Sequence, residues 1–402
     1  MRILLADQLD QATVEALTER EHECVVEPTL SADELPAKIP GFGALVVRST
    51  KVTAATIQAG DALELVIRAG AGTNTIDVQA AADAGIYVSN VPGRNAIAVA
   101  ELTMALLLAI DRRIADNVAD LRAGRWNKKS YSKADGLYGK TIGIIGLGDI
   151  GLAVAERAAA FGLTVRAVRK DGRSPAAEER IRTIGIELVD SLDELVAGSD
   201  IVTLHVPAAP ETKGMVDAAF LDRIRPGAIL LNTSRGDLID EPALLKAIDT
   251  KGLRVGLDVY PDEPASSAGE WSSELAQHPY VVGTHHIGAS TEQAQRAIAA
   301  GVVEIVDAFQ RGEILHCVNL ERSRLGRCSL HIRHYDRVGV LAQVLDLLRR
   351  GGLNVEQMEN RVFKRGNAAV ATIDVGDDLP REVLAQIEAI PDVIHASVVI
   401  AR

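Results

Sequence analysis

Thr141-Ile142-Gly143-Ile144-Ile145 is followed at once by Gly146-Leu147-Gly148-Asp149-Ile150-Gly151, and a helical pattern then runs from Leu152 to Phe161. Three glycines in this G-x-G-x-x-G spacing, between a strand and a helix, are typical of a loop that binds a pyrophosphate. The glycines let the backbone approach the ligand, and the helix N-terminus supplies positive potential. The stretch therefore predicts the first βα unit of a dinucleotide-binding fold. The expected contacts are Gly146, Gly148, Asp149, Ile150 and Gly151.

Apolar runs continue to alternate with helical stretches after this unit, as expected for βαβ connections and a parallel sheet. The further strands are expected at Thr164–Val168, Ile201–Val206, Ala228–Asn232, Val255–Val259 and Tyr280–Gly283. Together with the first strand this makes six, the number in a complete doubly wound dinucleotide fold.

The first ninety residues show the same alternation, with strands expected at Arg2–Ala6, Cys24–Val26, Ala44–Arg48, Leu65–Ala69 and Ile86–Asn90. Ligands bind such sheets at the carboxyl ends of the strands. Two segments lie at these ends, Arg48-Ser49 and Gly70-Ala71-Gly72. The glycine run has Thr75 where a third glycine would stand, so it is interpreted as a substrate loop.

Outside these two series, residues 95–123 form a long helical pattern that is apolar on most faces, which predicts a helix buried between domains or subunits. The last 75 residues follow the order β-α-β-β-α-β, which is ferredoxin-like. We predict an α/β protein with two doubly wound parallel sheets. A flavodoxin-like substrate domain would comprise residues 1–94 and 287–321, an inserted Rossmann domain 95–286, and a ferredoxin-like module 326–402, after a polar linker at 322–326.

The chain has 402 residues, a formal net charge of −12 and only 3% aromatic residues. An acidic surface repels nucleic acid and anionic membranes, and few aromatic side chains are present to stack on bases. The longest apolar stretch, 96–110, is shorter than the roughly 20 residues that span a bilayer. Three scattered cysteines favour buried apolar positions over disulfides or a metal site. With strand-like residues directly after Met1-Arg2, the sequence predicts a cytoplasmic protein without a metal, membrane or nucleic-acid partner.

The second strand of the dinucleotide unit bears on the choice of cofactor. An acidic residue at its end would bind the ribose 2′-hydroxyl of NAD. Arg169 stands at this place instead, with Lys170 and Arg173 nearby. NAD is the expected cofactor, and these cations make NADP the alternative because they could neutralise a 2′-phosphate. A solvent-exposed charge cluster with no role in binding is the other interpretation.

Three segments carry the residues suited to acid–base chemistry, and each directly follows a predicted strand. They are Asn232-Thr233-Ser234-Arg235-Gly236, Asp258-Val259-Tyr260-Pro261-Asp262-Glu263-Pro264 and His285-His286-Ile287-Gly288. Oxidising a 2-hydroxy acid requires a cation for the carboxylate, a proton carrier near neutral pH and a partner that tunes this carrier. Arg, His and Glu are these three.

With these segments the chain resembles the D-isomer-specific 2-hydroxyacid dehydrogenases, and among them the phosphoglycerate dehydrogenases that carry an ACT domain. The resemblance implies the oxidation of 3-phospho-D-glycerate to 3-phosphohydroxypyruvate, the first step of serine synthesis. It implies that Arg235 orients the substrate, His286 is the acid/base and Glu263 holds its imidazole. Further cofactor contacts would be Thr233, Ser234, Asp258 and Gly288. Substrate contacts would be Arg48, Ser49, Gly70, Ala71, Gly72, Asn95, Lys128 and Gln295.

The chain departs from the family pattern at several positions. Arg169 replaces the usual Asp, and His285 replaces the Pro before the acid/base. In the ACT module the resemblance implies an amino-acid effector at His334, Asp336 and Asn354, but Asp336 stands where serine-inhibited members carry Asn, which leaves serine feedback open. A homo-oligomer, dimer or tetramer, is expected. The alternatives are a glyoxylate or hydroxypyruvate reductase and, in another class, a cofactor-sensing protein that resembles the C-terminal-binding-protein corepressors.

Overall fold

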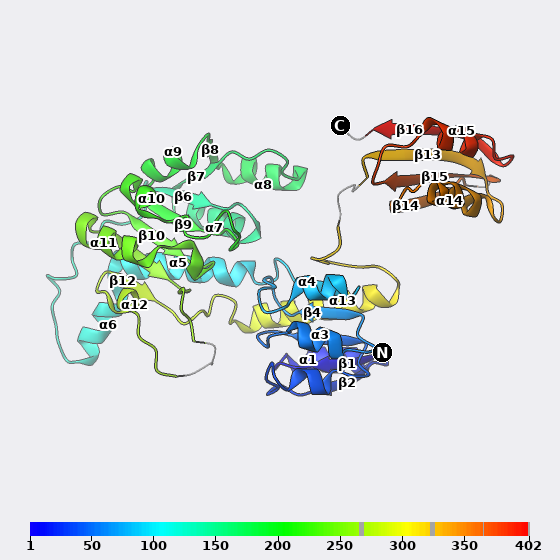
Figure 1. Cartoon of the computed structure of the whole chain (residues 1–402). Helices are drawn as coiled ribbons and strands as arrows, with labels where there is room; N and C mark the ends of the chain where they lie inside the picture. The colour runs from blue at the N-terminus through cyan, green and yellow to red at the C-terminus, as the bar shows by residue number, and fades with distance from the viewer. Residues whose placement is uncertain (265–268, 322–325, 365, 401–402) are drawn as a thin grey trace. The chain divides into compact units, whose positions relative to one another are not determined.

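The computed structural model describes residues 1–264, 269–321, 326–364 and 366–400. The chain forms two compact units, Met1–Val318 and Asn319–Arg402, and each is described by itself (Figure 1). Residues 322–325 of the expected linker lie outside the described residues. The further division of the first unit into a substrate domain and an inserted domain stays a prediction.

The first sheet has five parallel strands in the order β2-β1-β3-β4-β5, which is the flavodoxin order 2-1-3-4-5. The strands are β1 (Arg2–Leu5), β2 (Glu23–Val26), β3 (Ala44–Val47), β4 (Leu65–Arg68) and β5 (Tyr87–Asn90). The helices α1 (Gln11–Thr18), α2 (Leu35–Lys38), α3 (Ala54–Ala59) and α4 (Val78–Asp83) connect them. Because β3 and β4 are buried apolar runs, helices can cover both of their faces.

A helix far away in the sequence completes the packing of this sheet. Helix α13 (Glu292–Gln310) buries Ile298, Val302 and Val306 in one cluster with Ile3 and Leu5 of β1. The segment after α13 returns to β5, where Asn90 donates its backbone N–H to the carbonyl of His316 and Val318 donates to that of Val88. The two ends of this unit are therefore joined at one sheet.

The second sheet is parallel, with the strand order β12-β11-β10-β9-β6-β7-β8. Numbered from its own first strand this is 3-2-1-4-5-6-7, the doubly wound dinucleotide order with one added strand. The strands are β6 (Thr141–Ile145), β7 (Thr164–Val168), β8 (Glu187–Val189), β9 (Ile201–Leu204), β10 (Ile229–Asn232), β11 (Arg254–Leu257) and β12 (Val281–Gly283). The expected six strands are confirmed. The sequence interpretation missed the seventh strand, β8, because this strand has only three residues and gives no clear alternation.

Helices flank this second sheet on both sides (Figure 1). They are α7 (Asp149–Ala160), α8 (Pro175–Ile184), α9 (Leu192–Ala197), α10 (Ala218–Arg223), α11 (Glu241–Lys251), α12 (Glu274–Gln277) and the 3₁₀ turn η1 (Gly236–Leu238). Two apolar clusters form the core of this part. One contains Leu195 and Leu230, and the other contains Ile142 and Leu152.

The single buried helix expected over residues 95–123 was wrong. Helix α5 (Ala96–Arg112) is largely buried, but it ends at Arg113, whose φ of 50° is left-handed. Helix α6 (Ile114–Arg122) then begins in another direction and has no buried residue. Arg113 is held by an ion pair with Asp116 and by the ring of Tyr131, 4.9 Å from its guanidinium carbon. The apolar side chains of α6 are exposed in the single chain, and their expected burial between domains or subunits stays a prediction.

The second unit has the predicted βαββαβ order. Its elements are β13 (Cys328–Tyr335), α14 (Val340–Arg350), β14 (Val355–Val362), β15 (Ala368–Val375), α15 (Arg381–Glu388) and β16 (Val393–Ile400). The antiparallel sheet has the order β14-β15-β13-β16, and Leu330, Ile332, Val344 and Leu348 belong to a core of its own. The α/β fold class expected from the sequence is confirmed in both units.

Candidate functional site

Arg235 lies in a loop that is fixed at the end of β10. The buried side chain of Asn232 accepts hydrogen bonds from the backbone N–H and the hydroxyl of Ser234, at 3.0 and 2.8 Å. It also donates to the carbonyl of Arg235 at 2.8 Å. A Cβ on Gly236 would clash with the backbone of Tyr260 and Pro261, so the loop lies directly against the segment that leads to Glu263.

Glu263 and His286 form the predicted pair. The Nδ1 of His286 lies 2.7 Å from Oε2 of Glu263, while Oε1 accepts the backbone N–H of Tyr260 at 2.8 Å. Burial by itself would raise the pKa of Glu263. The hydrogen bonds from His286 and Tyr260, with the nearby charges of His286 and Arg235, outweigh burial and lower this pKa. The carboxylate therefore stays ionised, and it can stabilise an imidazolium.

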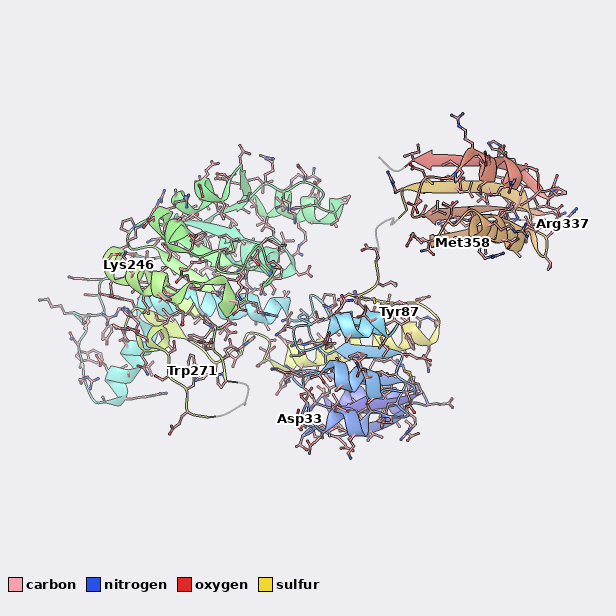
Figure 2. The ribbon with its side chains drawn as sticks, in the orientation of Figure 1. Asp33, Tyr87, Lys246, Trp271, Arg337 and Met358 are labelled. Atoms are coloured by element: carbon pink, nitrogen blue, oxygen red, sulfur yellow. The ribbon has the colours of Figure 1, made fainter. Side chains whose placement is uncertain are left out.

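The segment around this pair encloses a cavity of about 440 Å³, lined by Tyr260, Glu263, Trp271, His285 and His286 among others. The indole of Trp271 (Figure 2) donates to the carbonyl of Asp262 at 2.9 Å and packs edge-on against Tyr260. These contacts fix the loop that carries Glu263. The side chain of His286 is half exposed, so the imidazole is accessible to a substrate.

Asp258 lies at the end of β11, and its role in the structure is to hold the loop that carries His286. Its buried carboxylate accepts from the hydroxyl of Thr284 at 2.6 Å and from the backbone N–H groups of Ile287 and Gly288 at 2.8 Å each. The carbonyl of Asp258 accepts from the backbone of His286, whose φ is +52°. The sequence placed Asp258 beside the cofactor, and these bonds show how it positions the imidazole.

The glycine loop after β6 fits a dinucleotide. A Cβ on Gly151 would clash with the carbonyl of Gly146, so this glycine is required for helix α7 to pack close to β6. A Cβ on Gly148 would meet no atom within 4 Å, so the backbone there is open to an approaching phosphate. The neighbouring Asp149 and Ile150 begin α7, whose N-terminus supplies the positive potential. Thr233 and Ser234, the other expected contacts, are buried at the end of β10.

Arg68 is the functional candidate that the sequence interpretation missed. It ends β4, and its Nε atom is buried without a partner among the described residues. Burial first, and then the positive charges of Arg235 and Arg48, lower the pKa of Arg68 to about 10. The charges of Arg235 and Arg48 thus act on the guanidinium of Arg68, and the carboxylate of Asp7 acts in the opposite sense. A basic residue at the end of an otherwise apolar strand is the signal that could have revealed it.

Several predicted substrate residues lie around this arginine group. A Cβ on Gly72 would lie 2.5 Å from the guanidinium of Arg235. Asp7 accepts the backbone N–H groups of Arg48 and Ser49, which fixes the loop after β3. In the same region Gly70 lies close to Arg68, and the side chain of Asn90 donates to the carbonyl of Ala71. A cavity of about 630 Å³ there is lined by Arg48 and Gln295, among others.

Two of the predicted substrate residues are placed differently from the rest. Asn95 immediately precedes α5 and makes no side-chain cap. Lys128 is exposed and lines a cavity of about 530 Å³ beside α6, together with Trp126 and Tyr131. The contacts found among the described residues do not bring Lys128 to Arg48, so its substrate role stays a prediction.

The predicted effector residues lie on different parts of the second unit. His334 is buried, with Nδ1 2.8 Å from the carbonyl of Tyr335 and Nε2 3.1 Å from Oδ1 of Asn360. Asp336 is exposed just before α14. Asn354 donates to the carboxylate of Glu356. The single chain does not join these three in one pocket among its described residues.

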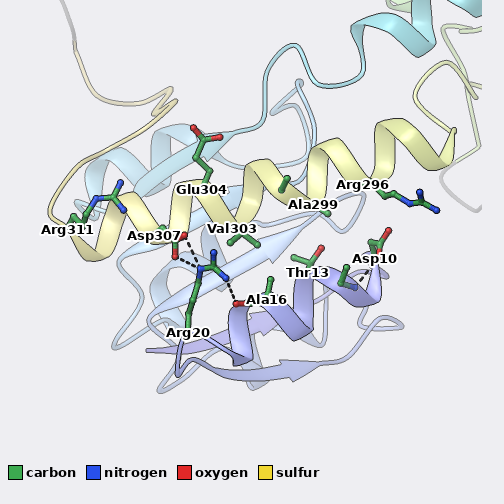
Figure 3. Close-up of a pocket in the computed structure, with 12 residues that line it drawn as sticks. Asp10, Thr13, Ala16, Arg20, Arg296, Ala299, Val303, Glu304, Asp307 and Arg311 are labelled. Atoms are coloured by element: carbon green, nitrogen blue, oxygen red, sulfur yellow. Dashed lines mark hydrogen bonds and ion pairs between the residues drawn. The ribbon is translucent and has the colours of Figure 1, made fainter.

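A separate cavity of about 480 Å³ lies between α1 and α13 (Figure 3). Its floor includes Ala16 and Val303, and Arg20 forms an ion pair with Asp307 at 2.8 Å on its rim. None of the described residues that line it is a predicted site residue. The described residues contain no cluster of His, Cys, Asp and Glu side chains that could hold a metal ion, and no helix long and apolar enough to cross a membrane.

Comparison with known proteins gives the same architecture. The profile described as D-isomer specific 2-hydroxyacid dehydrogenase, NAD binding domain, matches residues 104–288, and an AHAS small subunit-like ACT domain matches 330–395. A D-3-phosphoglycerate dehydrogenase of Methanocaldococcus jannaschii is 39% identical over 91% of this chain and 71% of its own length. A hydroxypyruvate reductase of Thermotoga maritima is 42% identical over 75% of this chain and 96% of its own. A glyoxylate reductase structure from Paecilomyes thermophila has a TM-score of 0.70 and 28% identity, covering 79% of this chain and 98% of its own.

A doubly wound dinucleotide domain with an arginine and a Glu–His pair at its strand ends defines an oxidoreductase that uses a nicotinamide cofactor. The chain belongs to the D-isomer-specific 2-hydroxyacid dehydrogenase family and carries an ACT domain. The family's NAD-binding domain supports NAD as its cofactor.

Proposed function

We propose that this chain oxidises 3-phospho-D-glycerate to 3-phosphohydroxypyruvate. The observation that carries the proposal is the group of Arg48, Arg68 and Arg235 at the strand ends, in which the charges of Arg48 and Arg235 act on Arg68 against the carboxylate of Asp7. A hydroxy acid with only a carboxylate would leave part of this positive charge unneutralised. A substrate with a carboxylate and a phosphate supplies several negative charges, and guanidinium groups bind both anions through paired hydrogen bonds.

Each residue of the site would have a separate role in the reaction. Arg235 binds the carboxylate of the substrate and orients C2, while Arg48 and Arg68 bind the phosphate. His286 accepts the proton of the C2 hydroxyl through Nε2, because Nδ1 is engaged by Glu263. The carboxylate of Glu263 stabilises the imidazolium that results. NAD held at the glycine loop would supply the acceptor for the hydride of C2, so that the hydroxyl carbon would become a carbonyl.

Hydroxypyruvate reduction is the second candidate, since the Thermotoga maritima relative of that name is 42% identical over nearly its full length. The two functions differ in whether the phosphate is required. The cofactor-sensing corepressor alternative is not proposed, because the relatives compared here are named as enzymes and the chain carries an ACT domain.

Initial rates on matched substrates decide between the two candidates. 3-Phosphoglycerate is compared with D-glycerate, and phosphohydroxypyruvate with hydroxypyruvate, each with NAD(H) and NADP(H). We expect kcat/KM to be at least about 100-fold higher for the phosphorylated member of each pair, because a site built for a charged group is left with unpaired cations by the analogue that lacks it. Equal or higher kcat/KM with hydroxypyruvate would assign the reductase function instead. D-Lactate and glyoxylate complete the comparison.

The regulatory part of the proposal concerns the second unit. An ACT domain is consistent with an amino-acid effector, and we propose that it binds near His334, Asp336 and Asn354. A homo-oligomer would bring edge strands of two such modules together. The exposed apolar side chains Ile114, Val118 and Leu121 of α6 offer a second contact between copies. A cytoplasmic location, without nucleic-acid or membrane partners, belongs to the same proposal.

A further inference from the structure

Arg169 occupies a defined place relative to the glycine loop. Strands β6 and β7 are parallel, and Ile144 is paired with Ala167. Gly146 directly follows the end of β6 and Arg169 directly follows the end of β7, so both residues lie at the same edge of the sheet, after strands that are about 4.8 Å apart. In a fold of this order the residue at this place faces the 2′-position of the adenosine ribose. The structure thus has a guanidinium where NAD-binding domains have a carboxylate.

Two more cations lie beside Arg169. The chain turns after Lys170, and Arg173 folds back so that its guanidinium donates to the carbonyls of Val168 at 3.0 Å and Lys170 at 3.2 Å. These bonds hold Arg173 over the carboxyl end of β7 and use only part of its five N–H donors. Lys170 is exposed and forms no ion pair among the described residues.

Acidic side chains also lie near these cations, and their contact with Arg169 is exposed. Asp171 is exposed in the turn. Asp190 follows β8 and accepts from Nε of Arg169 at 3.3 Å, but the two side chains are 59% and 86% exposed. An ion pair as exposed as this contributes little to stability, so a phosphate can replace the carboxylate of Asp190 at small cost. Glu194 lies beside Asp190 and accepts its backbone N–H at 3.2 Å, so three acidic side chains lie near the three cations. Binding of a 2′-phosphate therefore depends on the exchange of the exposed carboxylate of Asp190, and not on an excess of positive charge.

We propose that Arg169, Lys170 and Arg173 form a binding site for the 2′-phosphate of NADP(H), so that this chain uses NADP(H) as well as NAD(H). Arg169 would bind the phosphate through two guanidinium N–H groups, Lys170 would add a mobile positive charge, and Arg173 would fix the turn that presents both. This inference requires the dinucleotide fold of the family. It is independent of which hydroxy acid the enzyme oxidises.

Binding of two adenosine fragments to the full-length protein tests the site without substrate or turnover. 2′,5′-ADP and 5′-AMP differ only in the 2′-phosphate, and isothermal titration calorimetry gives the dissociation constant of each. We expect 2′,5′-ADP to bind at least about tenfold more tightly than 5′-AMP, the lower end of what hydrogen bonds to charged groups contribute. The difference should shrink at high salt, because the contacts are exposed and ionic.

Substitutions then assign the effect to the residues. Arg169→Ala and Lys170→Ala should each remove most of the preference for 2′,5′-ADP while leaving the affinity for 5′-AMP within about threefold. Arg182→Ala is the matched control, because Arg182 is an exposed arginine of α8 that pairs with Glu179 within the helix. Titrations of NADPH and NADH, followed by their fluorescence, should give the same order. Equal affinity of the wild type for the two fragments would overturn the proposal. An equal loss of affinity for 2′,5′-ADP and for 5′-AMP in the Arg169→Ala variant would also overturn it.

Discussion

The imidazole that contacts Glu263 belongs to His286 and not to its neighbour His285, although both line the same cavity. His286→Asn should lower kcat by at least about 100-fold, the usual contribution of a positioned acid/base. His285→Asn is the matched control in the same loop and should change kcat by much less. Steady-state kinetics of the two variants with 3-phosphoglycerate measure the difference. Equal losses would mean that the pair is not the proton carrier.

A second prediction about a single residue concerns the buried guanidinium of Arg68. Arg68→Met should raise KM for 3-phosphoglycerate by about 10- to 100-fold, since a charge-assisted hydrogen bond to the phosphate is lost. KM for D-glycerate should change by less than about threefold, provided that Arg235 still binds the carboxylate. Arg94→Met is the control, because Arg94 forms an exposed ion pair with Glu304. A uniform change for both substrates would exclude Arg68 from phosphate recognition.

His205, which follows β9 beside the glycine loop, makes stability depend on pH. Burial lowers the pKa of His205 to about 3, and its Nδ1 is buried without a partner among the described residues. Below the ordinary histidine pKa of about 6.5, the unfolded chain binds a proton that the folded chain does not. The free energy of unfolding therefore falls with pH below 6.5, by up to about 1.4 kcal/mol per unit, and does not change through this residue above 6.5.

Urea denaturation at pH 7.5 and 5.5 measures this effect. Between these values wild type should lose about 1 kcal/mol more than His205→Gln, whose side chain does not titrate. The comparison concerns only the change with pH, so any destabilisation common to both values cancels. Parallel losses in the two proteins would show that His205 does not carry the effect.

At the scale of elements, Gly151 and Gly148 at the junction of β6 and α7 have different roles. Gly151→Ala should lower the free energy of unfolding by more than about 2 kcal/mol, because the added methyl group meets the carbonyl of Gly146. Gly148→Ala should change it by less than about 0.5 kcal/mol, since the methyl group enters open space. The same variant should weaken NADH binding about tenfold or more by blocking the approach of the pyrophosphate. Denaturation and NADH titration of both variants check the two effects separately.

The elements that could be predicted from the sequence are those that a local pattern determines. The glycine loop, the strands of both parallel sheets except β8, and the segments after β10, β11 and β12 carry such a pattern. Three features lack one. Strand β8 is too short to alternate, and the left-handed turn at Arg113 occurs without a glycine to mark it. Arg68 matters because Arg48 and Arg235 lie near it, and such proximity depends on the folded chain.

At the scale of the whole molecule, the two units have separate cores. The core of the ACT domain contains Leu330, Val344 and Ile373 and no residue before Cys328. A chain that ends at residue 321 should therefore keep kcat within about threefold, since domains with their own cores fold alone. We expect it to keep the dimer of the dinucleotide domains and to lose higher assembly. Initial rates and light scattering test this, and an inactive or monomeric product would mean that the ACT domain is structural.

The late return of α13 to the first sheet has a consequence for the synthesis of the protein. Ile298, Val302 and Val306, which cover strand β1, leave the ribosome almost 300 residues after it. The second sheet lies entirely between residues 141 and 283, so it can be completed while one apolar face of the first sheet is still bare. Nascent chains expose such faces to aggregation. The first sheet therefore keeps an uncovered apolar face, and is open to aggregation during synthesis, for longer than the second sheet.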